Sequence, residues 1–323
     1  MISLINIKLS LSTINQNLCG KMIIYKNLDI KKNHKNSVVA IGNFDGLHVG
    51  HKKVLQEAKQ EAKKNNLKFG LITFEPAPTM FFNKTIKNHR INSLNQKIYF
   101  LKQINLDFLI IIKFNKIFSN LSAEGFIKNI LFKKLKSKYI FVSKNFKFGK
   151  KRFGNVITLK NFEKKYFYKT VITSPHRKKK QIVSSSLIRK IIYQGRVKEA
   201  KKLLGRTWSI EGVVIKGAQR GRKIGFPTCN IKLNSYTIPK LGVYSVWVQI
   251  DNLKKKGIAN IGYRPTFSGK SLLLEVNIFG IKRNLYKKIL KISFIKFIRS
   301  EKKFKNINQL KIQIKKDIII AKK

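Results

Sequence analysis

The most informative segment of the chain is Ser37-Val-Val-Ala-Ile-Gly-Asn-Phe-Asp-Gly-Leu-His-Val-Gly-His-Lys-Lys-Val-Leu55. It opens with an apolar run at 38–41, of the kind that a parallel sheet buries on both faces. Gly42, Gly46 and Gly50 then let the backbone turn tightly and approach a ligand. A helix is expected to begin near His51, where unpaired N–H groups and the helix dipole attract an anion. This order of elements predicts a phosphate-binding site.

Two histidines, His48 and His51, lie at the mouth of this turn. They could donate to a phosphate, form half of a metal site, or be ordinary surface residues. No Glu or Cys stands at ligand spacing, and Lys52 and Lys53 would repel a cation, which argues against a metal. Phosphate binding is favoured because it also explains the strand, the glycines and the helix.

The segment Asn43-Phe-Asp-Gly-Leu-His-Val-Gly-His51 resembles the HxGH signature of the nucleotidyltransferase superfamily, in the form found in bacterial FAD synthetases. The resemblance implies that His48 and His51 bind ATP phosphates and take part in catalysis. The further phosphate contacts expected here are Gly42, Asn43, Phe44, Asp45, Gly46 and Gly50.

A second segment, Ile182-Val-Ser-Ser-Ser-Leu-Ile-Arg189, is similar to the second signature of that superfamily. Serines at a helix start can cap the helix and leave hydroxyls facing an anion, and an arginine one turn further on adds a planar, charged fork. An ordinary serine cap is the alternative interpretation. Together with the first motif, the segment predicts ATP contacts by Ser184, Ser185 and Ser186 and a catalytic role for Arg189.

The rest of the first half alternates predicted helices and strands. Strands are expected at 68–74, 107–112, 139–142 and 166–172, and helices at 51–64, 93–104 and 122–135. The loop Ser143-Lys-Asn-Phe-Lys-Phe-Gly-Lys-Lys-Arg-Phe-Gly154 resembles the family segment that closes on the nucleotide and flavin phosphates. It implies flavin contacts by Asn145 and Phe148, although a plain basic loop is the alternative.

After a predicted strand at 211–215, the second half continues with Gly217-Ala-Gln-Arg-Gly-Arg-Lys-Ile-Gly-Phe-Pro-Thr-Cys-Asn-Ile231, which lacks the Gly-Lys-Ser/Thr of a Walker loop. It resembles the bacterial riboflavin kinase motif, whose threonine and asparagine bind magnesium under a glycine-rich flap; a barrel turn with a glycine bulge is the alternative. The resemblance implies magnesium ligands at Thr228 and Asn230. The expected contacts to ATP are Gly217, Arg222, Gly225 and Pro227.

Strands at 211–215, 242–249, 258–261, 272–279 and 290–297, followed by a helix at 308–321, predict a small antiparallel β-barrel closed by a helix. The kinase resemblance places the catalytic base on Glu275, and a carboxylate suits proton removal from an alcohol. An ordinary edge-strand glutamate is the alternative. The terminal pattern Arg299-Ser-Glu-Lys-Lys-Phe304 implies a flavin contact by Arg299.

Composition limits the remaining possibilities. The chain has 323 residues, 70 Lys and Arg against 14 Asp and Glu, and no apolar run long enough to span a membrane. The lysines are spread along the whole chain with many Asn, Ile and Phe, which favours drift in composition over a specific nucleic-acid partner. Two cysteines indicate a reducing compartment, and we expect the cytoplasm.

These patterns predict a loose extension at 1–21, which does not read as a signal peptide, and two domains. Residues 22–200 form a Rossmann-like adenylyltransferase domain with a parallel sheet, and residues 201–323 form a kinase barrel. The resemblance implies a bifunctional riboflavin kinase and FAD synthetase that uses Mg²⁺ with ATP and converts riboflavin to FMN and FAD. We expect a monomer or weak homo-oligomer. An adenylyltransferase with another acceptor and a nucleic-acid-binding descendant are the alternatives.

Overall fold

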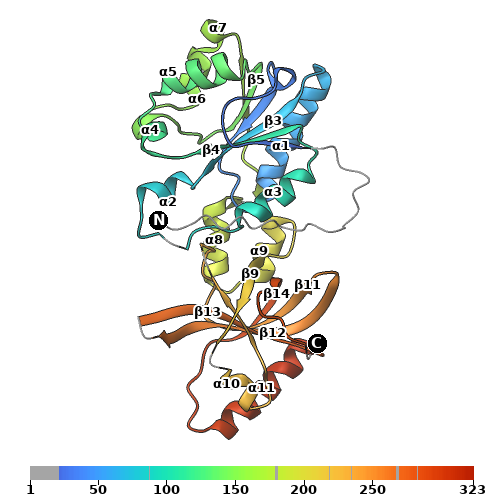
Figure 1. Ribbon diagram of the computed structural model, residues 1–323. Helices are drawn as coiled ribbons and strands as arrows, with labels where there is room; N and C mark the ends of the chain where they lie inside the picture. The colour runs from blue at the N-terminus through green and yellow to red at the C-terminus, as the bar shows by residue number, and fades with distance from the viewer. Residues whose placement is uncertain are drawn as a thin grey trace.

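The computed structural model describes residues 22–323, except for 87, 179–180, 218, 234, 267–268 and 282. The predicted extension at 1–21 lies outside the described residues. A sheet with its helices and a barrel are stacked end to end, with helices α8 (Ser185–Tyr193) and α9 (Val197–Leu204) between them (Figure 1).

The first half contains a six-stranded sheet in the order β1-β4-β3-β2-β5-β6, and every pairing is parallel. The strands are β1 (Ile23–Tyr25), β2 (Val38–Ile41), β3 (Phe69–Glu75), β4 (Phe108–Lys113), β5 (Tyr139–Ser143) and β6 (Lys169–Thr173). The parallel sheet predicted from the sequence is confirmed. The chain runs from β2 toward β4 on one side and continues with β5 on the other, so a topological switch point lies at β2, where open α/β sheets bind ligands.

Helices cover both faces of this sheet. They are α1 (Val49–Lys64), α2 (Pro78–Phe82), α3 (Leu94–Lys102), α4 (Lys116–Ser119), α5 (Ala123–Gly125), a π-helix (Phe126–Lys134), α6 (Val156–Asn161) and α7 (Glu163–Tyr166), with 3-10 turns at Lys32–His34 and Lys150–Arg152. The expected capping box of α3 is present, because Ser93 accepts from the N–H of Gln96 and Gln96 accepts from the N–H of Ser93. The Ser122 helix is confirmed, but most of it has π-helical hydrogen bonding.

The predicted strand at 166–172 begins too early. Tyr166 ends α7, and Phe167 adopts a left-handed conformation with φ of 55° before β6 starts at Lys169. The aromatic residues misled the prediction because Tyr166 and Tyr168 are buried under the sheet while still part of a helix end and a turn.

The second half is a closed antiparallel barrel in the order β10-β13-β12-β11-β14-β9, which confirms the predicted barrel. Its elements are β9 (Ser209–Ile215), α10 (Arg220–Lys223), β10 (Cys229–Lys232), β11 (Gly242–Ile250), β12 (Leu253–Thr266), β13 (Gly269–Ile278), β14 (Ile289–Arg299) and α11 (Ile307–Lys322). A short hairpin, β7 (Arg177–Lys178) with β8 (Gln181–Ile182), precedes α8. Strand β12 is much longer than the predicted 258–261, because its polar first half pairs with β11 along its full length.

A buried polar contact joins the two halves. The Trp208 side chain is 1% exposed and its Nε1 donates to the carbonyl of Ile91 at 2.9 Å. Gln96 of α3 donates to the carbonyl of Ser209 at 3.2 Å and accepts from the hydroxyl of Tyr236 at 3.1 Å. The sheet and the barrel therefore share one interface, and α9 runs without a break through the predicted domain boundary at residue 200, so that boundary stays a prediction.

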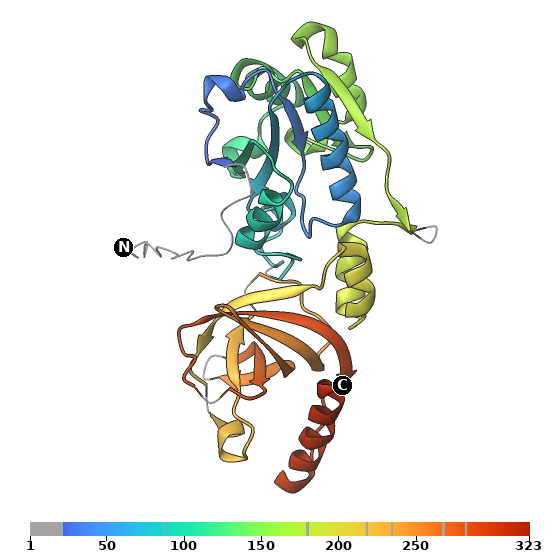
Figure 2. The same ribbon diagram turned by 90° about the vertical axis from the view of Figure 1, so that its right-hand side faces the viewer.

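Helix α11 closes the barrel on the side away from the sheet (Figure 2). Its Asp317 is 1% exposed and pairs with Arg299 at the end of β14, with 2.7 Å between Nη2 and Oδ2. The Nε of Arg299 also donates to Asp317. This pair anchors the helix because the Asp317 carboxylate is withdrawn from water and the Arg299 side chain is partly buried.

We expect Asp317→Asn to lower the free energy of unfolding by about 3 kcal/mol, because it removes the buried countercharge of a partly buried guanidinium. Asp251→Asn is the matched control, since its carboxylate is 60% exposed and pairs only loosely with Arg283 and Lys288. We expect that variant to change stability by less than about 0.5 kcal/mol. Urea unfolding followed by circular dichroism measures both, and equal losses would contradict the anchoring role of Asp317.

Candidate active sites

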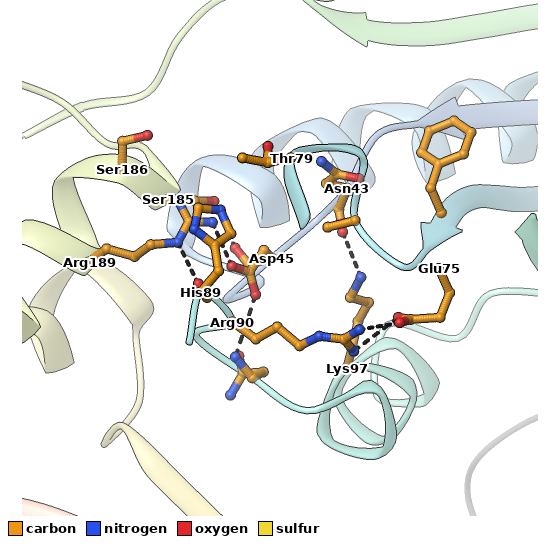
Figure 3. Close-up of a pocket in the computed structure, with 13 residues that line it drawn as sticks. Asn43, Asp45, Glu75, Thr79, His89, Arg90, Lys97, Ser185, Ser186 and Arg189 are labelled. Carbon is orange, nitrogen blue, oxygen red and sulfur yellow. Dashed lines mark hydrogen bonds and ion pairs between the residues drawn. The ribbon is translucent and has the colours of Figure 1, made fainter. Parts of the chain in front are cut away.

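A cavity of 320 Å³ lies at the carboxyl ends of β2 and β3 (Figure 3). Eleven of its thirteen lining residues have polar side chains, and they come from five separate segments of the chain. The lining residues are Asn43, Asp45, Phe74, Glu75, Ala77, Thr79, His89, Arg90, Asn92, Lys97, Ser185, Ser186 and Arg189. This is the edge of the sheet at which the sequence predicts a phosphate site.

The two sequence motifs meet in this cavity. Arg189 of α8 forms an ion pair with Asp45 of the turn after β2, with 2.7 Å between Nη2 and Oδ2. The Ser185 hydroxyl donates to the backbone carbonyl of Asp45 at 2.8 Å. Two segments that are 140 residues apart are therefore held together by direct contacts.

The Asp45 carboxylate is fully engaged. Besides Arg189, it accepts from the backbone N–H groups of Ile91 and Asn92, and the residue is 8% exposed. A carboxylate in this position repels a phosphate and orients the guanidinium beside it. We therefore assign Asp45 to positioning Arg189, whose Nε also donates to the His89 carbonyl at 2.7 Å.

His48 is the N-cap of α1, and its Nδ1 accepts from the N–H of His51 at 3.2 Å. The two rings stack with centroids 3.6 Å apart. Burial lowers the pKa of His48 to about 4, and burial together with the neighbouring His48 lowers the pKa of His51 well below its usual value. Both imidazoles are therefore neutral at pH 7, and they would meet a phosphate as hydrogen-bond donors.

The turn before α1 depends on Gly46, which has φ of +78°. A Cβ at this position would lie 2.9 Å from Cδ1 of Ile91, so a side chain is excluded by conformation and by space. Phe44 is 4% exposed and packs its ring edge against His51, with 5.2 Å between the ring centroids. Gly42 and Gly50 are also tightly surrounded, because a Cβ would lie 3.3 Å from the Phe44 ring at the first position and 3.2 Å from the His48 ring at the second.

Two polar atoms beside the turn are buried without a hydrogen-bond partner among the described residues. They are the Oδ1 of Asn43 and the Nδ1 of His51. A buried polar atom without a partner costs free energy, and a bound ligand is one way to satisfy it.

Sequence reasoning placed the Glu75–Pro78 loop at the ligand-binding end of the sheet, but it missed Thr79, His89, Arg90 and Lys97, all of which line the cavity. Arg90 forms an ion pair with Glu75. No motif marks these four residues, and the only signal was that Lys97 lies on a predicted helix. Their contribution depends on how loops far apart in the sequence meet.

The other residues of the first half that were predicted to bind ATP or flavin have different surroundings. The Ser184 hydroxyl caps α8 by accepting from Leu187, whereas Ser186 is exposed at the cavity. Asn145 is exposed, and the Phe148 ring is buried against Phe126 with centroids 5.4 Å apart. The flavin roles of Asn145 and Phe148 stay predictions.

The barrel brings Glu275 and Asn230 together. They are direct partners in the pairing of β13 with β10, and Asn260 of β12 lies opposite Glu275 on the other side. Gly217 lies against Asn230 so closely that a Cβ there would be 2.2 Å from Nδ2. The predicted base and one predicted metal ligand therefore lie side by side in the barrel.

The flap leading to β10 is open to solvent. Thr228, Pro227, Gly225 and Arg222 are exposed, and the Nδ2 of Asn277 donates to the Pro227 carbonyl at 2.7 Å. Arg299 lies apart in its pair with Asp317 and over the Phe304 ring. Its predicted flavin contact stays a prediction.

Comparison with known proteins assigns both halves. The family model for FAD synthetase matches residues 30–187, and that for riboflavin kinase matches residues 204–323. A protein of Buchnera aphidicola subsp. Schizaphis graminum, named bifunctional riboflavin kinase/FMN adenylyltransferase, is 44% identical to this chain. The Bacillus subtilis protein of the same name is 37% identical to it. The matches cover 91% and 89% of this chain and 96% and 92% of the relatives.

The chain belongs to this bifunctional family. An Escherichia coli K12 member is 34% identical over 88% of the chain and 91% of its own length. A solved structure described as a macrolide-efflux protein from Streptococcus pneumoniae matches with a TM-score of 0.81 and 31% identity. The match covers 93% of this chain and 98% of that one. Within the part of the chain that the structure describes, no helix has the length and apolar character to cross a bilayer.

The residues at the kinase flap fit the magnesium that the family implies. Thr228 offers a hydroxyl and Asn230 an amide oxygen, which are hard, neutral donors suited to an ion shared with ATP phosphates. Among the described residues, no cluster of three or more His, Cys, Asp or Glu side chains forms a separate metal site. When bound, the ion would neutralise phosphate charge during transfer.

The histidines give this family member a pH-dependent stability. The pKa of His48 is about 6.5 in the unfolded chain and about 4 in the folded protein. The contribution of this group to the free energy of unfolding is therefore present above pH 6.5 and is lost as the pH falls toward 4. Between pH 7 and pH 5 we expect the unfolding free energy to fall by about 2 kcal/mol from this group. His48→Asn keeps an N-cap acceptor and should lose that part of the slope. Urea unfolding at both pH values tests this, and an unchanged slope in the variant would be the contrary result.

Proposed function

We propose that this chain carries both activities of its family: it phosphorylates riboflavin with ATP to give FMN, and it adenylates FMN with a second ATP to give FAD and pyrophosphate. The observation that carries the proposal is the meeting of the two nucleotidyltransferase motifs, through the Asp45–Arg189 pair and the Ser185 bond, in one polar cavity. The barrel assembles a second, separate set of motif residues around Glu275.

In adenylyl transfer, an oxygen of the FMN phosphate attacks the α-phosphorus of ATP, and the bond from that phosphorus to the bridging oxygen breaks as pyrophosphate leaves. His48 and His51 are proposed to donate to the ATP phosphates at the start of α1, where the N–H groups also point toward the anion. Arg189, Ser185 and Ser186 supply further donors at the start of α8. No covalent intermediate is required, because the site works by positioning and charge stabilisation.

In the kinase reaction, the 5′-hydroxyl oxygen of riboflavin attacks the γ-phosphorus of ATP, and ADP leaves. Glu275 is proposed to accept the hydroxyl proton. Thr228 and Asn230 are proposed to hold Mg²⁺ with the phosphates beneath the flap formed by Gly217, Arg222, Gly225 and Pro227.

An aromatic group beside the first cavity offers a surface for the flavin ring. Phe82 of α2 is 65% exposed and packs edge to face against Phe81 and Phe114, and Thr79 of the same helix lines the cavity. We propose that the planar flavin ring stacks on the exposed Phe82 side chain. We propose a cytoplasmic enzyme, monomeric or weakly associated, without a specific nucleic-acid partner.

His51→Ala is expected to stop the second reaction alone. The variant should convert riboflavin to FMN at the normal rate, but FAD formation should fall at least about a hundredfold because a buried donor to the phosphates is lost. Separation of the flavins by chromatography after incubation with riboflavin and MgATP gives both rates. His48→Ala should behave in the same way, and normal FAD formation at saturating ATP in either variant would contradict the role of these residues.

Glu275→Gln is expected to give the opposite result. It keeps the shape of the side chain and removes the proton acceptor, so FMN formation should fall about a hundredfold or more. Supplied with FMN, the variant should still make FAD, because the residues of the first cavity are unchanged. Loss of both activities together, or persistence of the kinase reaction, would show that Glu275 is not the base.

A further inference from the structure

Lys97 is a buried cation in the first cavity. It lies on α3, is 8% exposed, and lines the cavity with its neighbours from β2 and β3 (Figure 3). Its Nζ donates to the carbonyl of Asn43 at 2.8 Å and to the Thr73 hydroxyl at 3.3 Å. Both of these acceptors are neutral, so the hydrogen bonds that hold the ammonium do not balance its charge.

The carboxylates near Lys97 are already paired with other cations. Asp45 forms its ion pair with Arg189, and Glu75 forms its ion pair with Arg90. Among the described residues, no ion pair within 4.0 Å includes Lys97, and the cavity lining holds three basic side chains, those of Arg90, Lys97 and Arg189, against two carboxylates. A buried charge without a partner is costly, and a cavity with one excess positive charge attracts an anion.

We propose that Lys97 is a catalytic residue of the adenylyl transfer site, where its ammonium binds a phosphate group of the substrates. This rests on the proposed function and adds to it a residue that neither sequence motif contains. An ammonium ion has three donors, and the two used by Asn43 and Thr73 leave one for the ligand. Asn43 lies in the turn that follows β2, so the Lys97 side chain connects this turn to the ligand.

The charged groups facing Lys97 make this contact sensitive to pH. Burial lowers the pKa of Lys97, Asp45 and Glu75 act in the opposite direction, and Arg90 lowers it further; His51 faces it from α1. Because phosphate binding needs the protonated form, affinity should fall as the pH rises through this lowered pKa. A guanidinium at the same position would stay charged over that range.

The test compares Lys97→Met with Lys97→Arg in the full-length chain, with FMN and MgATP as substrates. We expect Lys97→Met to reduce FAD formation about a hundredfold, whereas Lys97→Arg recovers at least about a tenth of the wild-type rate. A higher KM for FMN would assign the contact to the acceptor phosphate, a higher KM for ATP would assign it to the nucleotide, and a lower kcat alone would assign it to the transition state. Lys102→Met, an exposed lysine on the same helix, is the matched control and should keep full activity.

Two readouts separate this role from a structural one. Lys97→Met should melt at the same or a higher temperature than wild type, because it removes a buried charge and the Thr73 hydroxyl still donates to the Asn43 carbonyl. FAD formation by wild type should weaken at alkaline pH, through KM or through kcat according to the step that the contact serves, and this loss should be absent in Lys97→Arg. Conversion of riboflavin to FMN by the same samples reports that the chain is folded.

The outcomes that overturn the inference are distinct from failure of the proposed function. If wild type makes FAD and Lys97→Met makes it at nearly the same rate, Lys97 has no role at the phosphate. If Lys97→Met instead loses several degrees of melting temperature and both activities together, the lysine is structural. If wild type makes no FAD from FMN, the proposed function itself fails.

Discussion

The ion pair between Asp45 and Arg189 is the contact on which the first site depends. It joins the turn after β2 to the start of α8, and the same aspartate accepts from the backbone of Ile91 and Asn92. Because its carboxylate satisfies several groups at once, the loops of the cavity hold one geometry before any ligand arrives. Preorganisation of this kind is what a reaction without a covalent intermediate needs.

The barrel contributes to that geometry although it carries its own chemistry. Arg206, between α9 and β9, donates to the carbonyls of Gly46 and Leu47 and stacks on the Phe100 ring with its guanidinium carbon 3.9 Å from the centroid. The backbone of Arg90 donates to the Ser235 carbonyl in the loop after β10. The turn between β2 and α1 is therefore held in place by a residue next to the barrel, which gives a physical reason for both domains to be found in one chain.

Sequence patterns were enough to establish the fold class, the order of the strands along the chain and the two motif sets. Strands such as β2 and helices such as α3 follow from local apolar periodicity and from caps like Ser93, which act over a few residues. Boundaries failed where tertiary burial overrode the local pattern, as at Tyr166, and where pairing with a neighbouring strand did so, as in the polar half of β12. Asp45, Ser185 and Arg189, which line the cavity, could be predicted because motifs carry them.

How those residues are used depends instead on the three-dimensional arrangement. The structure shows that Asp45 is occupied by Arg189, that Ser184 is a helix cap, and that Lys97 and Arg90 help to complete the cavity. These facts rest on contacts between segments far apart in the chain, such as the 144 residues that separate Asp45 from Arg189. Sequence patterns report periodicity over short distances, whereas burial and the pairing of charges are set by which loops meet at the end of the sheet.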